Sequence, residues 1–287
     1  MAAMRLVKMH GLGNDYVYAD CMESRPENPA QLAVRISDRH FGVGSDGLIL
    51  VGRSDKADFS MDIYNADGSR AEMCGNGIRC AGKFVYDYGY TKSDTISIET
   101  LGGIKILRLI IQDGQCVGAV VDMGEPVFTP KKIPVLWNDD TMIDREINVG
   151  GRPYRVTAVN LGNPHAVTFV KDVDGLNIEA IGPLLENHSI FPARVNAEFA
   201  KVLDRKTVRM RVWERGSGET FACGTGATAT AIAAILNGYC DREVTVKLNG
   251  GDLKITWDEK TNHVFMEGSA TYVCEIVGYD TSCGTLC

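Results

Sequence analysis

Residues 74–89 read CGNGIRCAGKFVYDYG, and residues 223–238 read CGTGATATAIAAILNG. Each segment opens with Cys-Gly-x-Gly, continues through about eleven helix-compatible residues, and closes on a glycine. A glycine in that closing place is typical of the first residue after a helix, where the backbone turns left-handed. We therefore predict two helices, each beginning directly after a cysteine, at Cys74 and at Cys223.

The two segments lie 149 residues apart, and the same offset relates other parts of the chain. Self-similarity at a constant spacing is the signature of an internal repeat. It predicts two similar halves, residues 1–123 carrying Cys74 and residues 124–268 carrying Cys223, followed by a tail. Strands occur in runs without regular alternation with helices, which favours the α+β class, and Asn249-Gly250 predicts a tight hairpin. The further matched pairs are 12–14 with 161–163, 29–40 with 178–189, 61–65 with 210–214, and 89–90 with 238–239.

Composition excludes several classes of protein. The chain has 287 residues, 45% of them hydrophobic and 23% charged, which excludes a disordered chain and a coiled coil. The net charge of −7 argues against binding to nucleic acid, because a phosphate backbone needs a basic surface. No apolar run reaches the roughly 20 residues of a membrane span, and the start lacks the apolar core of a secretion signal. We expect a cytoplasmic protein whose nine cysteines are reduced.

The position of the two cysteines predicts their chemistry. Unpaired N–H groups at the start of a helix favour an anion, so a thiol there can have a lowered pKa and act as a base. The neighbouring glycines let a ligand carboxylate approach the same N–H groups. Two such thiols facing each other could act on one carbon, one removing a proton while the other delivers one. That reaction inverts the carbon centre by general acid–base catalysis.

Other functions stay open on the residues alone. One cysteine could be the nucleophile of a thiol oxidoreductase or acyl-transfer enzyme, although this leaves the second Cys-Gly-x-Gly without a role. The protein could instead bind small amino acids without chemistry. Residues 42–47 fit GxGxxG but precede an apparent strand, which disfavours a dinucleotide site. Cys283 and Cys287 are a weak metal signal, and no lysine can be argued to anchor pyridoxal phosphate. We predict no metal and no cofactor.

Six motifs occur in order along nearly the whole chain: MHGLGNDYV (9–17), GVGSDG (42–47), YNADGSRAEMCGNGIRC (64–80), NLGNPHAV (160–167), VNAEF (195–199) and WERGSGETFACGTGA (213–227). Through these motifs the chain resembles the diaminopimelate epimerase family. The family's fold implies two mirrored halves, each a mixed or antiparallel sheet wrapped around a central helix, with the tail from residue 269 returning to the first half. Its members are cofactor-independent isomerases (amino-acid racemases and epimerases) that interconvert LL- and meso-diaminopimelate in lysine and cell-wall precursor synthesis, and are cytoplasmic homodimers.

The resemblance also implies roles for single residues. Cys74 and Cys223 would be the acid–base pair, with His165 and Glu214 tuning their pKa values. Arg215 would hold the distal carboxylate of the substrate through its planar guanidinium. Gly47 stands where several family members carry Gln and could offer backbone contacts only. The remaining substrate-binding residues would be Asn14, Asn65, Gly75, Asn76, Asn163, Asn196, Glu214, Gly224 and Thr225.

Overall fold

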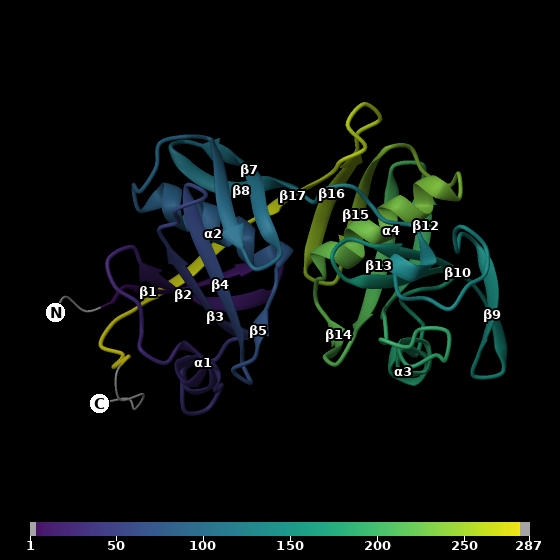
Figure 1. Ribbon diagram of the computed structural model, residues 1–287, viewed down its shortest axis with the longest axis horizontal. Helices are drawn as coiled ribbons and strands as arrows, with labels where there is room; N and C mark the ends of the chain where they lie inside the picture. Colours follow the sequence, from purple (N-terminus) through teal and green to yellow (C-terminus); the bar gives the residue numbers. More distant parts are fainter. Residues whose placement is uncertain (1–3, 282–287) are drawn as a thin grey trace. The chain divides into compact units, whose positions relative to one another are not determined.

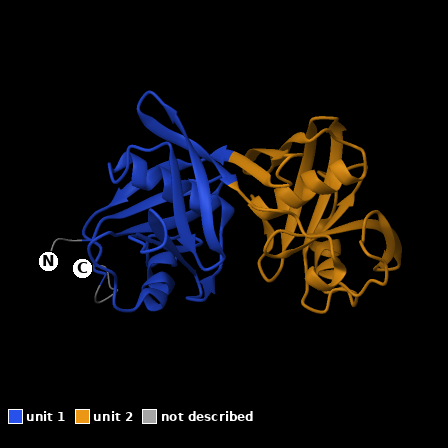
Figure 2. Ribbon diagram, turned by 45° about the horizontal axis from the view of Figure 1, so that its top comes forward, with its two compact units in different colours: residues 1–121, 268–287 blue, residues 122–267 orange. Residues whose placement is uncertain are grey.

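In the computed structural model, which describes residues 4–281, the chain divides into two compact units. One unit holds the residues up to Val121 and those from Gly268 onward, and the other is Asp122–Glu267 (Figure 2). The boundaries predicted from the repeat lie within two residues of these. Cys283 and Cys287 fall outside the described residues.

The first unit is a mixed sheet in the order β18-β1-β2-β3-β4-β6-β7-β8, with the short β5 also paired to β4 (Figure 1). Only the β2–β3 and β4–β6 pairs are parallel. Its elements are β1 (Leu6–Gly11), β2 (Asn14–Cys21), α1 (Pro29–Ser37), β3 (Gly47–Gly52), β4 (Phe59–Asn65), β5 (Arg70–Ala71), α2 (Gly75–Asp87), β6 (Thr95–Thr100), β7 (Gly103–Gln112), β8 (Gln115–Asp122) and β18 (Thr271–Ile276).

The second unit repeats this order as β9-β10-β11-β12-β13-β15-β16-β17, with β14 paired to β13. Its parallel pairs, β11–β12 and β13–β15, stand at the corresponding places. Its elements are β9 (Arg145–Val149), β10 (Arg152–Asn160), β11 (Pro164–Phe169), α3 (Ile178–Glu186), β12 (Asn196–Asp204), β13 (Thr207–Glu214), β14 (Gly218–Thr220), α4 (Gly224–Leu236), β15 (Glu243–Leu248), β16 (Gly251–Trp257) and β17 (Val264–Ser269), preceded by the short 3-10 helix Pro130–Lys132.

The offset of 149 residues relates the two units element by element. It carries the bounds of α1 onto those of α3 and the bounds of α2 onto those of α4 without any shift. Two strands lie outside the repeat, β9 on the edge of β10 and β18 on the edge of β1. The C-terminal strand therefore occupies, in the first unit, the place that β9 occupies in the second. The predicted α+β class and the two pseudosymmetric halves are confirmed.

A buried helix forms the centre of each unit. Residues 75–85 of α2 are all buried, and so is nearly all of α4, because the sheet of each unit packs around its helix (Figure 1). Such a helix is ordinarily apolar or small on every side, and the Ala- and Thr-rich sequence of α4 fits this pattern, whereas α2 also buries the charged side chains of Arg79 and Lys83. Helix α2 ends at Asp87 and α4 at Leu236. The predicted closing glycines, Gly89 and Gly238, follow two residues later with φ angles of +77° and +72°.

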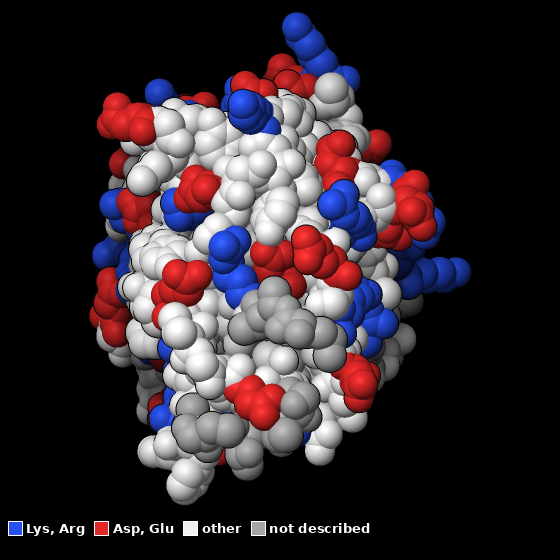
Figure 3. Space-filling view, turned by 90° about the vertical axis from the view of Figure 1, so that its left-hand side faces the viewer, with Lys and Arg blue, Asp and Glu red and all other residues white. Residues whose placement is uncertain are grey.

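Two further expectations concern turns and surfaces. The predicted hairpin at Asn249-Gly250 is confirmed, since Leu248 of β15 pairs with Gly251 of β16. On the face of the first unit that Figure 3 presents, acidic and basic side chains are interspersed rather than gathered by sign. Among the described residues, no helix is long and apolar enough to cross a membrane.

Candidate active site

Cys74 and Cys223 are the N-caps of the two central helices. Cys74 has extended backbone angles (φ −136°, ψ 112°), and its Sγ accepts the N–H of Gly77 at 3.3 Å. Cys223 has nearly the same angles (φ −119°, ψ 113°), and its Sγ accepts the N–H of Gly226 at 3.4 Å. Each sulfur thus takes the place of the oxygen of an ordinary N-cap. The sequence prediction of a thiol at each helix start is met in both units.

A side chain from the sheet lies close behind each sulfur, against the second glycine of the motif. A Cβ built on Gly77 would lie 2.7 Å from Ile49 Cδ1, and one built on Gly226 would lie 2.8 Å from Glu198 Oε1. The second glycine of Cys-Gly-x-Gly therefore lets a side chain from the sheet lie against the first helical turn. In the first unit that side chain is apolar, whereas in the second it carries a carboxyl group.

Asn14 is the polar neighbour of Cys74. The Cys74 thiol donates to Asn14 Oδ1 at 3.3 Å, and Asn14 Nδ2 donates to Asp46 Oδ2 at 2.8 Å. Burial raises the pKa of Asp46, and the nearby charge of Asp15 raises it further. This chain of hydrogen bonds turns the carbonyl side of the Asn14 amide toward the sulfur.

A fully buried cation, Arg79, lies in α2 behind the same turn. Its guanidinium donates to Gly75 O (3.0 Å), to Asn76 Oδ1 (3.0 Å) and to Ser269 O (3.1 Å). Burial lowers the pKa of Arg79, and its interactions with Cys80 and, to a smaller extent, with Cys74 oppose that shift. Arg79 was not singled out from the sequence. The repeat offers a signal, because the offset pairs this arginine with the uncharged Thr228.

The charged groups near Cys223 are acidic, whereas the charged group near Cys74 is the basic Arg79. Burial raises the pKa of the Cys223 thiol well above its usual range, and the carboxyl groups of Glu214 and Glu198 raise it further. Thr225 Oγ1, 3.5 Å from the sulfur, opposes this shift. For Cys223 the predicted lowering of the pKa is therefore wrong, because burial and two acids outweigh the effect of the helix start.

His165 lies between two oxygen atoms in the interior of the second unit. Its Nδ1 is 2.6 Å from Glu198 Oε1, and its Nε2 is 2.8 Å from Asn163 Oδ1. Burial lowers the pKa of His165 to about 3, against an opposing effect of Glu214. Burial raises the pKa of Glu198, and Glu214 adds to that rise. His165 and Asn163 were named from the sequence, whereas Glu198, which the offset pairs with the apolar Ile49, was missed.

Buried side chains form hydrogen bonds to the loop that carries Arg215. Glu186, only 6% exposed, accepts hydrogen bonds from Trp213 Nε1 (2.7 Å) and from the N–H of Gly216 (3.0 Å). Asn196 Oδ1 accepts the N–H of Arg215 at 2.9 Å, and Asn196 Nδ2 donates to the carbonyl of Pro164. The exposed guanidinium of Arg215 donates to the carbonyl of residue 193.

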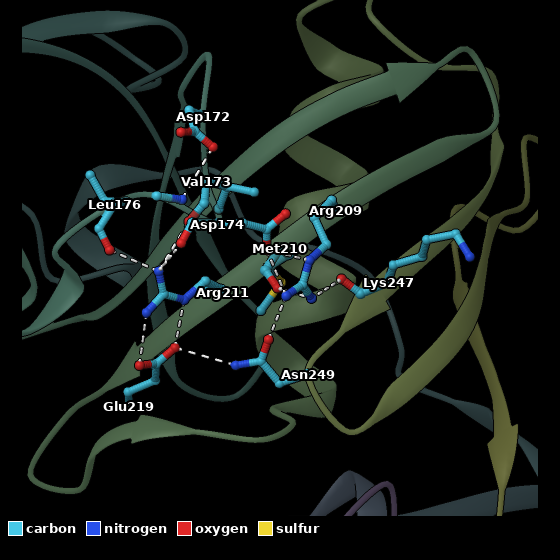
Figure 4. A network of polar contacts seen from close by, with 11 residues as sticks. Asp172, Val173, Asp174, Leu176, Arg209, Met210, Arg211, Glu219, Lys247 and Asn249 are labelled. Atoms are coloured by element: carbon cyan, nitrogen blue, oxygen red, sulfur yellow. Dashed lines mark hydrogen bonds and ion pairs between the residues drawn. The ribbon is translucent and has the colours of Figure 1, made fainter.

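The strand between that loop and Cys223 is fixed by a second network (Figure 4). Arg211 on β13 forms a two-bond pair with Glu219 on β14 (2.7 and 3.0 Å) and donates to carbonyls of residues 173, 174 and 176. The offset of 149 residues relates Arg211 to Asp62 and Glu219 to Arg70, and these two residues also form an ion pair. The same cross-strand contact thus exists in both units with the charges exchanged.

The remaining predicted residues lie at the edges of these two groups. Asn65 donates to Ser69 Oγ in the turn after β4, and Glu214 accepts from the Thr220 hydroxyl. Gly47 is buried, and a Cβ there would lie 2.2 Å from Tyr64 O, so this chain has no room for a side chain at that place. Gly75, Asn76 and Gly224 lie in the first turns of their helices. Within residues 4–281, no group of three His, Cys, Asp or Glu side chains could hold a metal ion.

Comparison with known proteins assigns this arrangement to a family. The model of the family described as diaminopimelate epimerase matches residues 6–129 and 157–273. The diaminopimelate epimerase of Acetivibrio thermocellus is 54% identical over 95% of this chain and 97% of its own length. That of Methanococcus maripaludis is 54% identical over 95% and 98%. The crystal structure of a probable proline racemase from Agrobacterium radiobacter shares the fold, with a TM-score of 0.69 at 14% identity over 96% of this chain and 92% of that one.

Proposed function

The chain belongs to the diaminopimelate epimerase family, and from that premise we propose how it moves the α-proton of its substrate. The protein is an isomerase that interconverts LL- and meso-diaminopimelate in lysine biosynthesis. One thiolate removes the proton from the α-carbon, and the thiol of the other unit donates a proton to the opposite face. The configuration of that carbon is thereby inverted.

One observation supports this proposal above the others: both cysteines cap a central helix with the same geometry. Each sulfur accepts an N–H three residues further on, so a negative charge on either atom is stabilised in the same way. An epimerase that works in both directions needs two groups that can each serve as acid and as base. A nucleophilic enzyme needs only one such cysteine.

The substrate carboxylate at the reacting carbon would be bound by first-turn N–H groups. The first hydrogen bonds within the helices run from Ile78 to Cys74 and from Ala227 to Cys223, so the N–H groups before them take no part in the helical ladder. Those of Gly75-Asn76 and Gly224-Thr225 are the donors we assign to the carboxylate.

The distal end of diaminopimelate carries a second amino and carboxylate group. Arg215 would bind that carboxylate with two parallel hydrogen bonds, since its guanidinium is exposed and its backbone is fixed by Asn196. Asn14, Asn65 and Asn163 would orient the amino and carboxylate groups. In this proposal Asn196 and Glu214 serve mainly to hold the loop and to set the charge near Cys223.

The charged groups near the two thiols differ in sign before substrate binds. A buried guanidinium interacts with Cys74, whereas burial and the carboxylate of Glu214 raise the pKa of Cys223. We therefore propose that Cys74 is the thiol that gives up its proton first, and that Cys223 keeps its proton and serves as the donor. Proton transfer in one direction would reverse this assignment until the protons exchange with water.

Single cysteine variants test the proposal. Cys74→Ser and Cys223→Ser should each lower kcat about 100- to 10,000-fold, because an alcohol is a much weaker base than a thiolate. Cys274→Ser, which changes an exposed cysteine, is the matched control and should keep wild-type activity. Near-normal turnover in either of the first two variants contradicts the two-base mechanism.

We expect the protein to act in the cytoplasm as a homodimer, as the family resemblance implies. Sedimentation of the purified protein tests the second part. A monomer at micromolar concentration with full activity contradicts it.

A further inference from the structure

Glu198 is a buried acid for which the proposed mechanism gives no direct task. It lies on β12, its side chain is fully buried, and Oε1 is 2.6 Å from His165 Nδ1. His165 in turn contacts Asn163, a residue assigned above to substrate binding. We propose that Glu198 is a positioning residue that, through His165, turns the N–H side of the Asn163 amide toward the substrate carboxylate. This inference rests on the proposed function.

The direction of the hydrogen bonds follows from the atoms involved. Asn163 Oδ1 can only accept, so the Nε2 atom 2.8 Å away must carry a hydrogen. Nδ1 then either accepts from a protonated Glu198, or carries a second hydrogen and pairs with an ionised one. In both cases Asn163 uses its carbonyl oxygen on His165, which leaves its Nδ2 group to donate outward.

The surroundings favour the neutral arrangement, in which Glu198 keeps its proton. Within the described chain, Glu198 Oε2 has no hydrogen-bond partner. An ionised carboxylate would need partners for both oxygens, whereas a protonated acid leaves only a carbonyl there. The charged groups that act on this pair are Glu214 on β13 and Arg215 in the loop after it. Glu214 opposes a negative charge on Glu198, and burial keeps His165 neutral, with a pKa of about 3.

Comparison of the two units shows that packing alone does not require an acidic residue at position 198. Ile49 holds the corresponding place in the first unit, and its Cδ1 lies against Gly77 as Glu198 Oε1 lies against Gly226. An apolar side chain therefore suits this position of the fold. The offset also pairs His165 with Tyr16, so the second unit differs from the first at both members of the pair.

Without a donor at residue 198, the direction of the hydrogen bonds through His165 to Asn163 would no longer be fixed. His165 could then carry its hydrogen on Nδ1 and accept at Nε2. Asn163 would rotate its amide to donate to that nitrogen, and its carbonyl oxygen would face the substrate carboxylate. Two like partial charges would then meet at the binding site, which weakens substrate binding more than it changes the proton transfer.

Two substitutions separate this role from a merely structural one. Glu198→Ile, which copies the first unit, removes the donor and should raise KM for diaminopimelate about tenfold or more, with kcat changed less than about threefold. Glu198→Gln can still donate to Nδ1 and should restore KM to within about threefold of wild type. Thermal melts of both variants control for folding. Equal KM values for the Ile variant and wild type overturn the proposal, and so does a Gln variant as impaired as the Ile variant.

A measurement independent of turnover examines the histidine itself. In protein labelled with 15N-histidine, the five histidines give separate side-chain nitrogen signals, and His165→Gln identifies those of His165. Wild type and Glu198→Gln should show hydrogen on Nε2 alone at neutral pH, and Glu198→Ile should show hydrogen on Nδ1. A wild-type ring that carries hydrogen on Nδ1 alone overturns the proposal, because Asn163 would then have to donate to Nε2. This readout stands even if diaminopimelate proves not to be the substrate, so the two failures are distinguishable.

Discussion

Replacing Glu198 by glutamine should change how the stability of the second unit depends on pH. Burial raises the pKa of Glu198 well above its ordinary value of 4.5, and Glu214 adds to the rise. The folded protein therefore keeps a proton on this carboxyl at pH values where the unfolded chain has lost it. A group of this kind stabilises the fold fully below its unfolded pKa, and the stabilisation is lost as pH rises toward the folded pKa.

The size of the effect follows from one proton. Each pH unit over which the folded acid is protonated and the unfolded acid is ionised lowers the free energy of unfolding by about 1.4 kcal/mol. A glutamine side chain does not titrate, so the Glu198→Gln variant lacks this loss. Between about pH 5 and about pH 7, the variant should gain up to about 2.7 kcal/mol relative to wild type. The lowered pKa of His165 destabilises both proteins toward acid pH, so it cancels in the difference.

Urea unfolding followed by tryptophan fluorescence measures this difference. All three tryptophans, at positions 137, 213 and 257, belong to the second unit, so the signal follows the unit that contains Glu198. Glu259→Gln is the matched control, because it also replaces one carboxyl group of the second unit, and that side chain is 75% exposed beside Arg242. A curve for Glu198→Gln that runs parallel to wild type would mean that the folded His165–Glu198 pair holds no titratable proton, and it would refute a protonated Glu198.

Three other perturbations have definite expected outcomes. Arg215→Lys should lower kcat/KM for diaminopimelate about 30-fold or more, because an ammonium cannot form two parallel bonds to a carboxylate. The melting temperature should stay unchanged. Equal losses on a mono-amino acid substrate, if one is turned over, would contradict a role of Arg215 at the distal end. Arg79→Met should slow alkylation of Cys74 by iodoacetamide about tenfold at neutral pH, as measured by mass spectrometry of the labelled peptide. An unchanged rate would show that the Arg79 guanidinium does not favour the Cys74 thiolate. Arg211→Ala and Glu219→Ala should each lower the free energy of unfolding by about 1–3 kcal/mol in urea titrations, and the double variant should lose less than the sum, whereas additive losses would mean that the pair does not act as a unit.

The duplicated fold could be predicted well because one constant offset constrains many segments at once. Identical bounds for α1 and α3, and for α2 and α4, follow from this single relation. The cysteine N-caps were also predictable, since Cys-Gly-x-Gly before a helical run and a glycine after it are local signals. The strand on the edge of β1 was not predictable from pattern, because β18 pairs over a separation of nearly the whole chain.

The site residues that could not be found from the sequence are buried charges. Glu198 stands in the strand segment VNAEF, and Arg79 stands in the helical run after Cys74. Charged side chains are ordinarily exposed, and only the packing of the sheet around each helix shows that both of these are buried. The repeat itself holds a usable signal, because the offset pairs each of them with an uncharged residue, Ile49 and Thr228.

The pKa of Cys223 was predicted in the wrong direction for the same reason. The start of a helix favours a thiolate, but this effect is smaller than the cost of burial beside Glu214 and Glu198. The sequence shows the helix start directly, whereas it does not show which strands place their carboxyl groups against the sulfur.

Turnover in D2O tests the two-base mechanism most directly. With LL- or meso-diaminopimelate as the starting material, mass spectrometry early in the reaction should find one deuterium in each product molecule and none in the remaining substrate. The reason is that the donating thiol exchanges with solvent, while the removed proton stays on the other sulfur. Product that retains the substrate's own α-hydrogen would contradict the account, because a single base would then have carried that hydrogen from one face to the other.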